Sequence, residues 1–389
     1  MSSTDDVEVE TTETAATTET TEKRVTWAEL FFDLVYVFAV TEVSSLLHEN
    51  HGWAGLLRAL IVFVPLYWSW VGTSILANTQ DLTSAASRIG IFAVGLCGLF
   101  MALAVPDAYG DRGALFGCAY MAARIVLATM MFRRVPWSIN PIAVGLVVSG
   151  PLILAGGFVH GTAREAIWGV AALIDLSSPT VLRNRLRTMR FDPGHLAERF
   201  GLFLIIALGE SVVAIGGPAA AQRGHLSTGV LSAVAAAFVL ACGLWWVYFH
   251  FAADAMRYAL TTAQVQTHIA RHVMTYGHLL LIGSVIAVAV GMRESVARPG
   301  QQLPWSVAGL LVGGVALYLA TYGYTRWAMF RLVSTTRLSG AAAVLVLLPI
   351  ARHVPALAAL TLVAAVLVGL NVVEYIRVRR ATPNAIGPR

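Results

Sequence analysis

The sequence of 389 residues has few charged side chains and many apolar ones. Asp, Glu, Lys and Arg make up only 13% of it, hydrophobic residues make up 57%, and the mean hydropathy is +0.70. Water-soluble domains are usually about 25% charged and about 45–50% apolar. Too little polar side-chain area remains to cover a soluble body of this size. The composition therefore excludes a single soluble enzyme domain and predicts an all-α polytopic membrane protein.

Cysteine is also scarce, and several well-known motifs are missing. Cys97, Cys118 and Cys242 lie far apart in apolar runs and form no CxxC pair, so we expect neither disulfides nor a cysteine metal site. The N-terminus is acidic and polar, which does not predict a cleavable signal peptide. No Walker A motif, Rossmann glycine fingerprint or GxSxG motif occurs in the sequence. We therefore expect no cofactor, and no ATP-driven transport by this chain alone.

Apolar stretches of about 20 residues, long enough to cross a bilayer as helices, recur along the chain. We expect about twelve, near residues 26–47, 54–77, 88–106, 113–132, 138–159, 163–182, 196–216, 226–250, 269–290, 304–324, 338–352 and 356–376. Residues 1–24 are rich in Thr and Glu and poor in aromatics, which predicts a disordered cytoplasmic tail. Residues 381–389 are expected to form a second cytoplasmic tail.

Basic residues are distributed unevenly around these spans. Residues 1–24 hold seven acids and two bases, so the rest of the chain holds 22 − 7 = 15 acids and 27 − 2 = 25 bases. With the N-terminus inside, seventeen Lys and Arg fall on the inner side and six on the outer side. This follows the positive-inside rule and predicts an inner (plasma) membrane protein with both termini in the cytoplasm. The bilayer, and not nucleic acid, is the expected partner of the basic loops.

The second half of the chain resembles the first. Residues 120–133 (YMAARIVLATMMFR) align without a gap with residues 318–331 (YLATYGYTRWAMFR), and Glu42 aligns with Glu210 when one gap is allowed. Six predicted spans separate the copies, an even number, so both copies have the same orientation. The sequence therefore predicts a parallel 6+6 repeat, with halves at residues 25–190 and 191–380.

Six acidic residues fall within or at the ends of the predicted spans. They are Glu29, Asp33 and Glu42 in the first span, Asp175 in the sixth, and Glu198 and Glu210 in the seventh. A carboxylate at the bilayer centre costs about 2.5–3.5 kcal/mol on insertion scales, so such groups face a bundle interior or water and usually pair. All six are candidates for proton coupling. An alternative role for Glu29 is to stabilise the first turn of its helix.

Basic side chains near these acids have competing interpretations. Arg124, in the fourth span, is the expected counter-ion of one acid, and Arg199 is a second charge partner. An alternative interpretation groups Arg199 with His195 and Glu198 in a polar collar, whose side chains snorkel to the cytoplasmic edge of the membrane. His268 and His272 are four residues apart and are weak metal candidates, although polar interface residues are the simpler interpretation.

The first and seventh spans together carry a family resemblance. WAELFFDLVYVFAVTEVSSLL and HLAERFGLFLIIALGESVVAIG resemble the bacterial low-temperature requirement A family of integral membrane proteins, over about residues 24–380. The resemblance implies a multi-pass bacterial inner-membrane protein and implies no chemistry. The motif positions that it carries over are Glu29, Phe31, Phe32, Asp33, Glu198, Arg199, Gly209 and Glu210.

Three functions remain open from the sequence. The leading hypothesis is a secondary transporter or a proton- or cation-coupled permease for an unknown small solute or ion. It predicts that Glu42, Glu210 and Asp175 converge on one cavity. A membrane-embedded Asp/Glu/His enzyme predicts an acid beside His268 and His272. A structural or lipid-interacting protein predicts scattered acids, each paired with an arginine.

The predicted topology is testable with reporter fusions. A reporter that is active only outside the cytoplasm should give no signal when it is fused after Arg389, because an even number of spans returns the chain to its starting side. The same reporter inserted after Arg223, in a loop predicted to lie outside, should give a strong signal. A strong signal from the fusion after Arg389 would contradict twelve spans.

Overall fold

A computed structural model describes residues 23–132 and 141–381, and these residues are mostly α-helical. The predicted N-terminal tail lies outside the described residues up to residue 22, and the predicted C-terminal tail lies outside them from residue 382. No strand longer than an isolated bridge, Gln302 to Pro355, occurs in the described part of the chain. The expectation of an all-α membrane protein agrees with this architecture.

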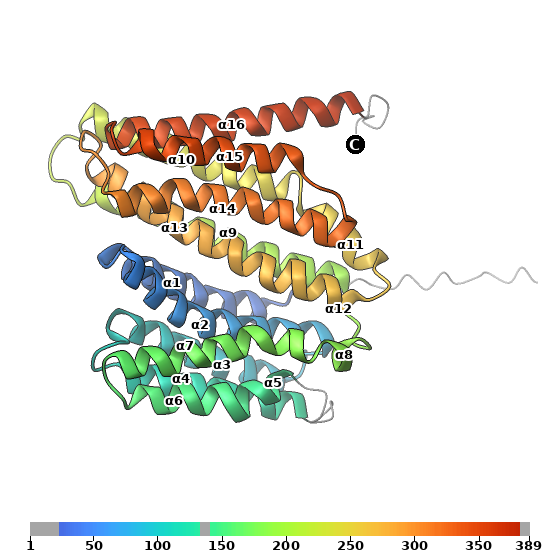
Figure 1. Cartoon of the computed structure of the whole chain (residues 1–389). Helices are drawn as coiled ribbons and strands as arrows, with labels where there is room; N and C mark the ends of the chain where they lie inside the picture. The colour runs from blue at the N-terminus through green and yellow to red at the C-terminus, as the bar shows by residue number, and fades with distance from the viewer. Residues whose placement is uncertain (1–22, 133–140, 382–389) are drawn as a thin grey trace, which may run out of the picture.

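The helices form two groups whose long axes run in the same general direction (Figure 1). The first group contains α1 (Trp27–Glu49), α2 (Trp53–Thr79), α3 (Ala85–Ala104), α4 (Gly113–Phe132), α5 (Pro141–Val144), α6 (Gly150–Gly157), α7 (Thr162–Val181) and α8 (Arg183–Leu186). The second contains α9 (Pro193–Ala220), α10 (Thr228–Phe249), α11 (Ala253–Thr262), α12 (Gln266–Ile269), α13 (His278–Ala297), α14 (Trp305–Phe330), α15 (Thr335–Ala351) and α16 (Ala356–Ala381). Two segments, Gly145–Ser149 and Ala270–Gly277, are π-helical.

Nine helices in the described ranges are long and apolar enough to cross a membrane. Two further apolar helices, Ile142–Gly157 and Thr335–Ala351, are shorter, and they coincide with the predicted spans 138–159 and 338–352. The predicted span 163–182 coincides with α7, which has 20 residues but carries Arg164, Glu165 and Asp175. The structure therefore supports a multi-pass protein, and twelve crossings remain a prediction.

Each group packs its helices in the same order. In the first group α1 packs on α3, α3 on α4, α4 on α6, α6 on α7, and α7 on α2. In the second group α9 packs on α13, α13 on α14, α14 on α15, α15 on α16, and α16 on α10. The groups meet where α1 contacts α9 and α13, and where α2 contacts α9. The contact between the groups thus involves α1 and α2 of the first group and α9 and α13 of the second.

Local interactions fix where α1 and α9 begin. Thr26 and Glu29 form a capping box at the start of α1, and the Asp192 side chain accepts a hydrogen bond from the His195 amide at the start of α9. Lys23, just before α1, connects this region to two other helix ends. Its ammonium donates hydrogen bonds to the carbonyl oxygens of Ala77 and Gln80 at the end of α2, and its backbone N–H donates to Asp192 at the start of α9. Burial lowers the pKa of Lys23, an effect that neighbouring carboxylates oppose.

Helix α13 packs closely against α14, so alanine substitutions at the adjacent residues Gly313 and Gly314 should affect stability differently. A Cβ at Gly314 would lie 2.8 Å from Val288 Cγ2 and 3.0 Å from the Ser284 carbonyl oxygen, whereas a Cβ at Gly313 would meet nothing within 4 Å. Gly314→Ala should therefore lower stability by about 1–3 kcal/mol through overpacking. Gly313→Ala should leave it unchanged or raise it, because alanine is the better helix former. Thermal unfolding in detergent measures both, and equal melting temperatures would contradict the packing.

Candidate functional site

Four ionisable side chains form a buried network where α1 meets α9. Glu29, Asp33, His195 and Arg199 are each at most 2% exposed. His195 Nε2 lies 3.0 Å from Glu29 Oε2, and Arg199 NH1 donates to Asp33 Oδ2 over 2.6 Å. Arg199 Nε lies 3.5 Å from Glu29 Oε2. One helix thus supplies both acids, and the other supplies both bases.

Helix α2 completes this network with neutral donors. The indole N–H of Trp70 donates to Asp33 Oδ1 over 2.8 Å, and Arg199 NH2 donates to Ser74 Oγ over 3.3 Å. Asn78 Nδ2 lies 3.2 Å from His195 Nδ1. The network thus combines two carboxylates, one guanidinium and one imidazole, all removed from solvent.

His195 and Arg199 do not form the polar collar considered from the sequence, because both are buried. His195 and Arg199 lie one turn apart and both face α1, which removes them from solvent, whereas Glu198 on the adjoining face of α9 is exposed. Glu29 lies in the first turn of α1, as the alternative role expects, and its part in proton coupling remains a prediction. It caps the first turn of α1 and also contacts His195.

Glu210 lies further along the same interface. It is 3% exposed, and its Oε2 accepts a hydrogen bond of 2.5 Å from the Thr41 hydroxyl. No Lys, Arg or His in the described ranges is within ion-pair distance of Glu210. Glu42, next to Thr41 in α1, is only partly buried. Glu210 is therefore a buried carboxylate that faces neutral hydroxyls, those of Thr41 and Ser44.

Aromatic rings separate Glu210 from the network around Arg199. Arg199 and Glu210 are about 16 Å apart along α9, at 1.5 Å per residue. Between them, Phe203 stacks on Trp70 with ring centroids 4.1 Å apart and meets the edge of Tyr36 at 6.1 Å. The two polar sites on α9 thus lie on either side of an aromatic layer.

Asp175 belongs to a different cluster inside the first group of helices. Its Oδ2 lies 3.2 Å from Arg124 NH2 and also accepts a hydrogen bond from Tyr120, while its Oδ1 accepts one of 2.6 Å from Ser149. Arg124 is thus the partner of Asp175. Because Glu210 contacts α1 instead, the structure does not bring Asp175 together with Glu210.

The two histidines considered for metal binding have other partners. The rings of His268 and His272 are 4.6 Å apart between centroids. His272 Nδ1 lies 2.6 Å from the Tyr324 hydroxyl, and its Nε2 lies 3.1 Å from Arg271 NH2. In the described part of the chain, no group of three or more His, Cys, Asp or Glu side chains is placed to hold a metal ion. The metal interpretation therefore gains no support.

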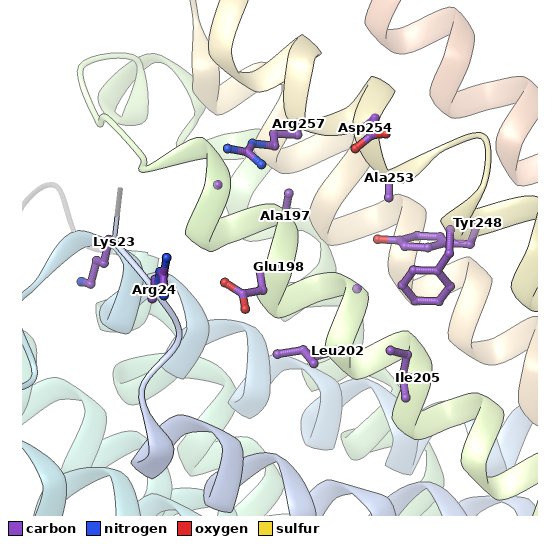
Figure 2. A pocket seen from close by; sticks show the side chains of 13 residues that line it. Lys23, Arg24, Ala197, Glu198, Leu202, Ile205, Tyr248, Ala253, Asp254 and Arg257 are labelled. Atoms are coloured by element: carbon purple, nitrogen blue, oxygen red, sulfur yellow. The ribbon is translucent and has the colours of Figure 1, made fainter. Parts of the chain in front are cut away.

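Glu198 points into an open groove beside the buried network (Figure 2). The groove has a volume of about 520 Å³ and lies between the segment before α1, helix α9, and the end of α10 with α11. Lys23, Arg24 and Arg257 contribute positive charge to its lining, and Glu198 and Asp254 contribute negative charge. A polar surface thus lies one helix face away from His195 and Arg199.

Comparison with known proteins gives the family. The sequence profile described as "Bacterial low temperature requirement A protein (LtrA)" matches residues 24–372. The chain belongs to the LtrA family. An uncharacterized protein of Rhizobium meliloti (strain 1021) is 33% identical over 317 residues, which cover 77% of this chain and 76% of that protein. No solved structure matches.

The sequence did not indicate that α2 belongs to the site of this LtrA-family protein. From the sequence alone, Trp70 is interpreted as an interfacial anchor or as part of a cavity lining, and Ser74 and Asn78 are not among the candidate residues. A signal was present, because four polar side chains in the run WSWVGTSILAN interrupt a long apolar helix. The structure shows α2 to be largely buried, and buried polar groups need partners.

The buried network of this LtrA-family protein predicts a large stability effect. Arg199→Met should destabilise the protein by about 3–5 kcal/mol, because it leaves the Asp33 carboxylate buried without its cation. Arg58→Met is the matched control, since Arg58 is 42% exposed in its 2.6 Å pair with Glu165 and such pairs contribute about 1 kcal/mol or less. Thermal unfolding in detergent compares them. Equal losses would show that the Arg199 network is not energetically special.

Proposed function

We propose that this LtrA-family protein is a secondary transporter or a proton- or cation-coupled permease, and that Glu210 is its protonatable group. The observation that carries the proposal is the burial of the Glu210 carboxylate, at 3% exposure, against the neutral hydroxyls of Thr41 and Ser44. A charged carboxylate in such a place is costly, and binding a proton or a small cation removes that cost. Glu210 is thus suited to loading and unloading.

The position of Glu210 supports the same role. In many transporters, coupling sites lie near the bilayer midplane, where two repeated halves meet. Glu210 lies on α9 and contacts α1. These two helices form part of the interface between the two groups. The neighbouring acid Glu42 comes from the other group, so each proposed half contributes one carboxylate to this region.

The proposed architecture is twelve spans in a parallel 6+6 arrangement, with halves at residues 25–190 and 191–380. The repeated packing order of the two groups supports it, as does the alignment of residues 120–133 with 318–331. The excess of basic residues on one side supports cytoplasmic termini and an inner-membrane location. The two short apolar helices, α15 and the segment Ile142–Gly157, hold the same fifth position in each half.

The network near the start of α9 is proposed as a second proton-binding site. Glu29 contacts the imidazole of His195, a type of side chain that commonly exchanges protons in proteins. The groove beside Glu198 would bring water or solute close to this pair. Asp33 is proposed to keep Arg199 in place rather than to exchange protons.

A structural role is the second candidate function, and it has its own support. Three buried or largely buried acids are paired with arginines, as that alternative expects: Asp33 with Arg199, Asp175 with Arg124, and Glu374 with Arg337. Such pairs can hold helices together without any transport. The enzyme alternative needs an acid beside His268 and His272, and no feature in the described residues supports it.

Flux measurements on the reconstituted protein test the transport proposal. In liposomes containing a pH-sensitive dye, Glu210→Gln should abolish proton movement, because glutamine keeps the shape and the hydrogen bond but does not titrate. Glu165→Gln is the control, since Glu165 pairs with the exposed Arg58 at the periphery. The control should retain wild-type flux. Candidate solutes are added in turn to reveal coupling.

Two results would favour the structural role instead. One is a wild-type flux in Glu210→Gln. The other is a loss of flux in Glu210→Gln together with a fall in melting temperature in detergent. Both would show that the carboxylate serves packing rather than proton exchange.

A further inference from the structure

A cavity of about 80 Å³ lies between the two groups of helices and is separate from Glu210 and from the groove beside Glu198. Helices α2, α4 and α7 form one wall, and α12 with the π-helical segment Ala270–Gly277 forms the other. Most of the lining is apolar and includes Trp68, Ile75 and Met189. The cavity thus offers an apolar enclosure at the junction of the two groups.

Arg124 is a buried cavity-lining side chain whose N–H groups are not all hydrogen-bonded within the described residues. It is 2% exposed and lines the cavity, yet its bonds to Asp175 and to the Tyr120 hydroxyl both come from NH2. Its Nε is buried without a hydrogen-bond partner. A guanidinium carries five N–H donors in a planar fork that matches a carboxylate. The Nε of Arg124 faces Gly145, where a Cβ would lie 3.0 Å away, whereas NH1 lies toward Gly72 in the cavity lining and is the donor placed to meet an anion.

A second arginine strengthens the preference for an anion. Arg271 also lines the cavity, and its Nε is likewise buried without a partner. Its other nitrogens contact the Pro179 carbonyl oxygen and His272. No acidic residue of the described chain lines the cavity, since Asp175 lies behind Arg124. The two charged side chains in the lining are therefore both positive, and its other polar groups are neutral hydroxyls.

Both π-helical segments of the protein adjoin this site. In the segment Gly145–Ser149, a Cβ at Gly145 would lie 2.9 Å from Arg124 Cζ, and Ser149 holds Asp175. The other segment, Ala270–Gly277, supplies Arg271. π-Helical turns are rare and occur frequently at functional sites. Here they fix the surroundings of both arginines.

We infer that this cavity binds a short-chain organic monocarboxylate. The carboxylate lies against Arg124 and Arg271, and the alkyl chain lies along Trp68 and Ile75. A water needs about 10–15 Å³ of such space, so about 80 Å³ holds roughly six water-sized groups, the size of a carboxylate with four to six carbons. An inorganic anion would leave the apolar wall unfilled. The inference concerns binding and does not depend on the transport proposal.

Calorimetric titration of the full-length protein in detergent with sodium pentanoate tests the inference. We expect binding in the millimolar range. Gly72→Ala should weaken it about tenfold or more, because the new methyl group would lie in the cavity 3.9 Å from Arg124 NH1. That methyl makes only an ordinary 3.4 Å contact with Leu127, so folding should be preserved. Gly169→Ala is the control, since its methyl would contact only Ile61, at 3.7 Å, away from the cavity.

Charge and shape are tested separately. Pentanamide, which is neutral and of the same shape, should not bind, and Arg271→Gln should weaken pentanoate binding several-fold. The inference is overturned if the wild type does not bind pentanoate, or if Gly72→Ala binds it as the wild type does while melting at the same temperature. It is also overturned if pentanamide binds equally well, or if phosphate or chloride displaces pentanoate at equal concentration.

Discussion

The burial of charge between α1 and α9 is the constraint on which the rest of this architecture depends. Removing a carboxylate from water is costly, and the Asp33 carboxylate can remain 2% exposed because Arg199 and Trp70 satisfy its two oxygens. The same requirement places Glu29 against His195. These contacts join helices that belong to different groups, so the charge pairing also determines how the two groups meet.

The buried acids differ in what their partners allow them to do. Arginine stays protonated at any physiological pH, so Asp33 and Asp175 each face a permanent positive charge. The Thr41 hydroxyl can donate to a charged Glu210 or accept from a protonated one. Buried carboxylates thus suit different tasks. Asp33 and Asp175 are suited to holding helices together, whereas Glu210 is suited to the proton exchange that we propose for it.

Composition and periodicity predicted the membrane class and the position of most helices, because hydrophobic runs are local properties of the sequence. The acids were also recognisable, since a carboxylate in an apolar run is conspicuous. Arg124 and Arg199 were recognisable as charge partners, but the acid that each one binds was not, because Asp33 and Arg199 are 166 residues apart and meet only through the packing of α1 on α9. His195 was placed near an edge by its position in the predicted span, and tertiary packing buried it instead.

Other features had weak sequence signals or none. The segment Ala270–Gly277 contains no Pro, so its π-helical geometry has no visible cause in the sequence, and α11 is too short and too polar to register as a span. Trp70 was the least predictable residue of the site. Tryptophan in a membrane helix commonly lies at the interface with water, whereas here its N–H is committed to Asp33.

The aromatic layer around Phe203 links the two polar sites on α9 in a way that helix spacing alone does not. Trp70 both stacks on Phe203 and donates to Asp33, so one side chain belongs to the layer and to the charged network. A change in the hydrogen bonding of Asp33 must therefore alter a ring that separates this network from Glu210. Under the proposed function, a proton that passes between Glu29 and Glu210 along this interface has to cross the layer of Trp70, Phe203 and Tyr36. Under the proposed function, α2 is then the element that connects the charge state at one end of the interface to access at the other.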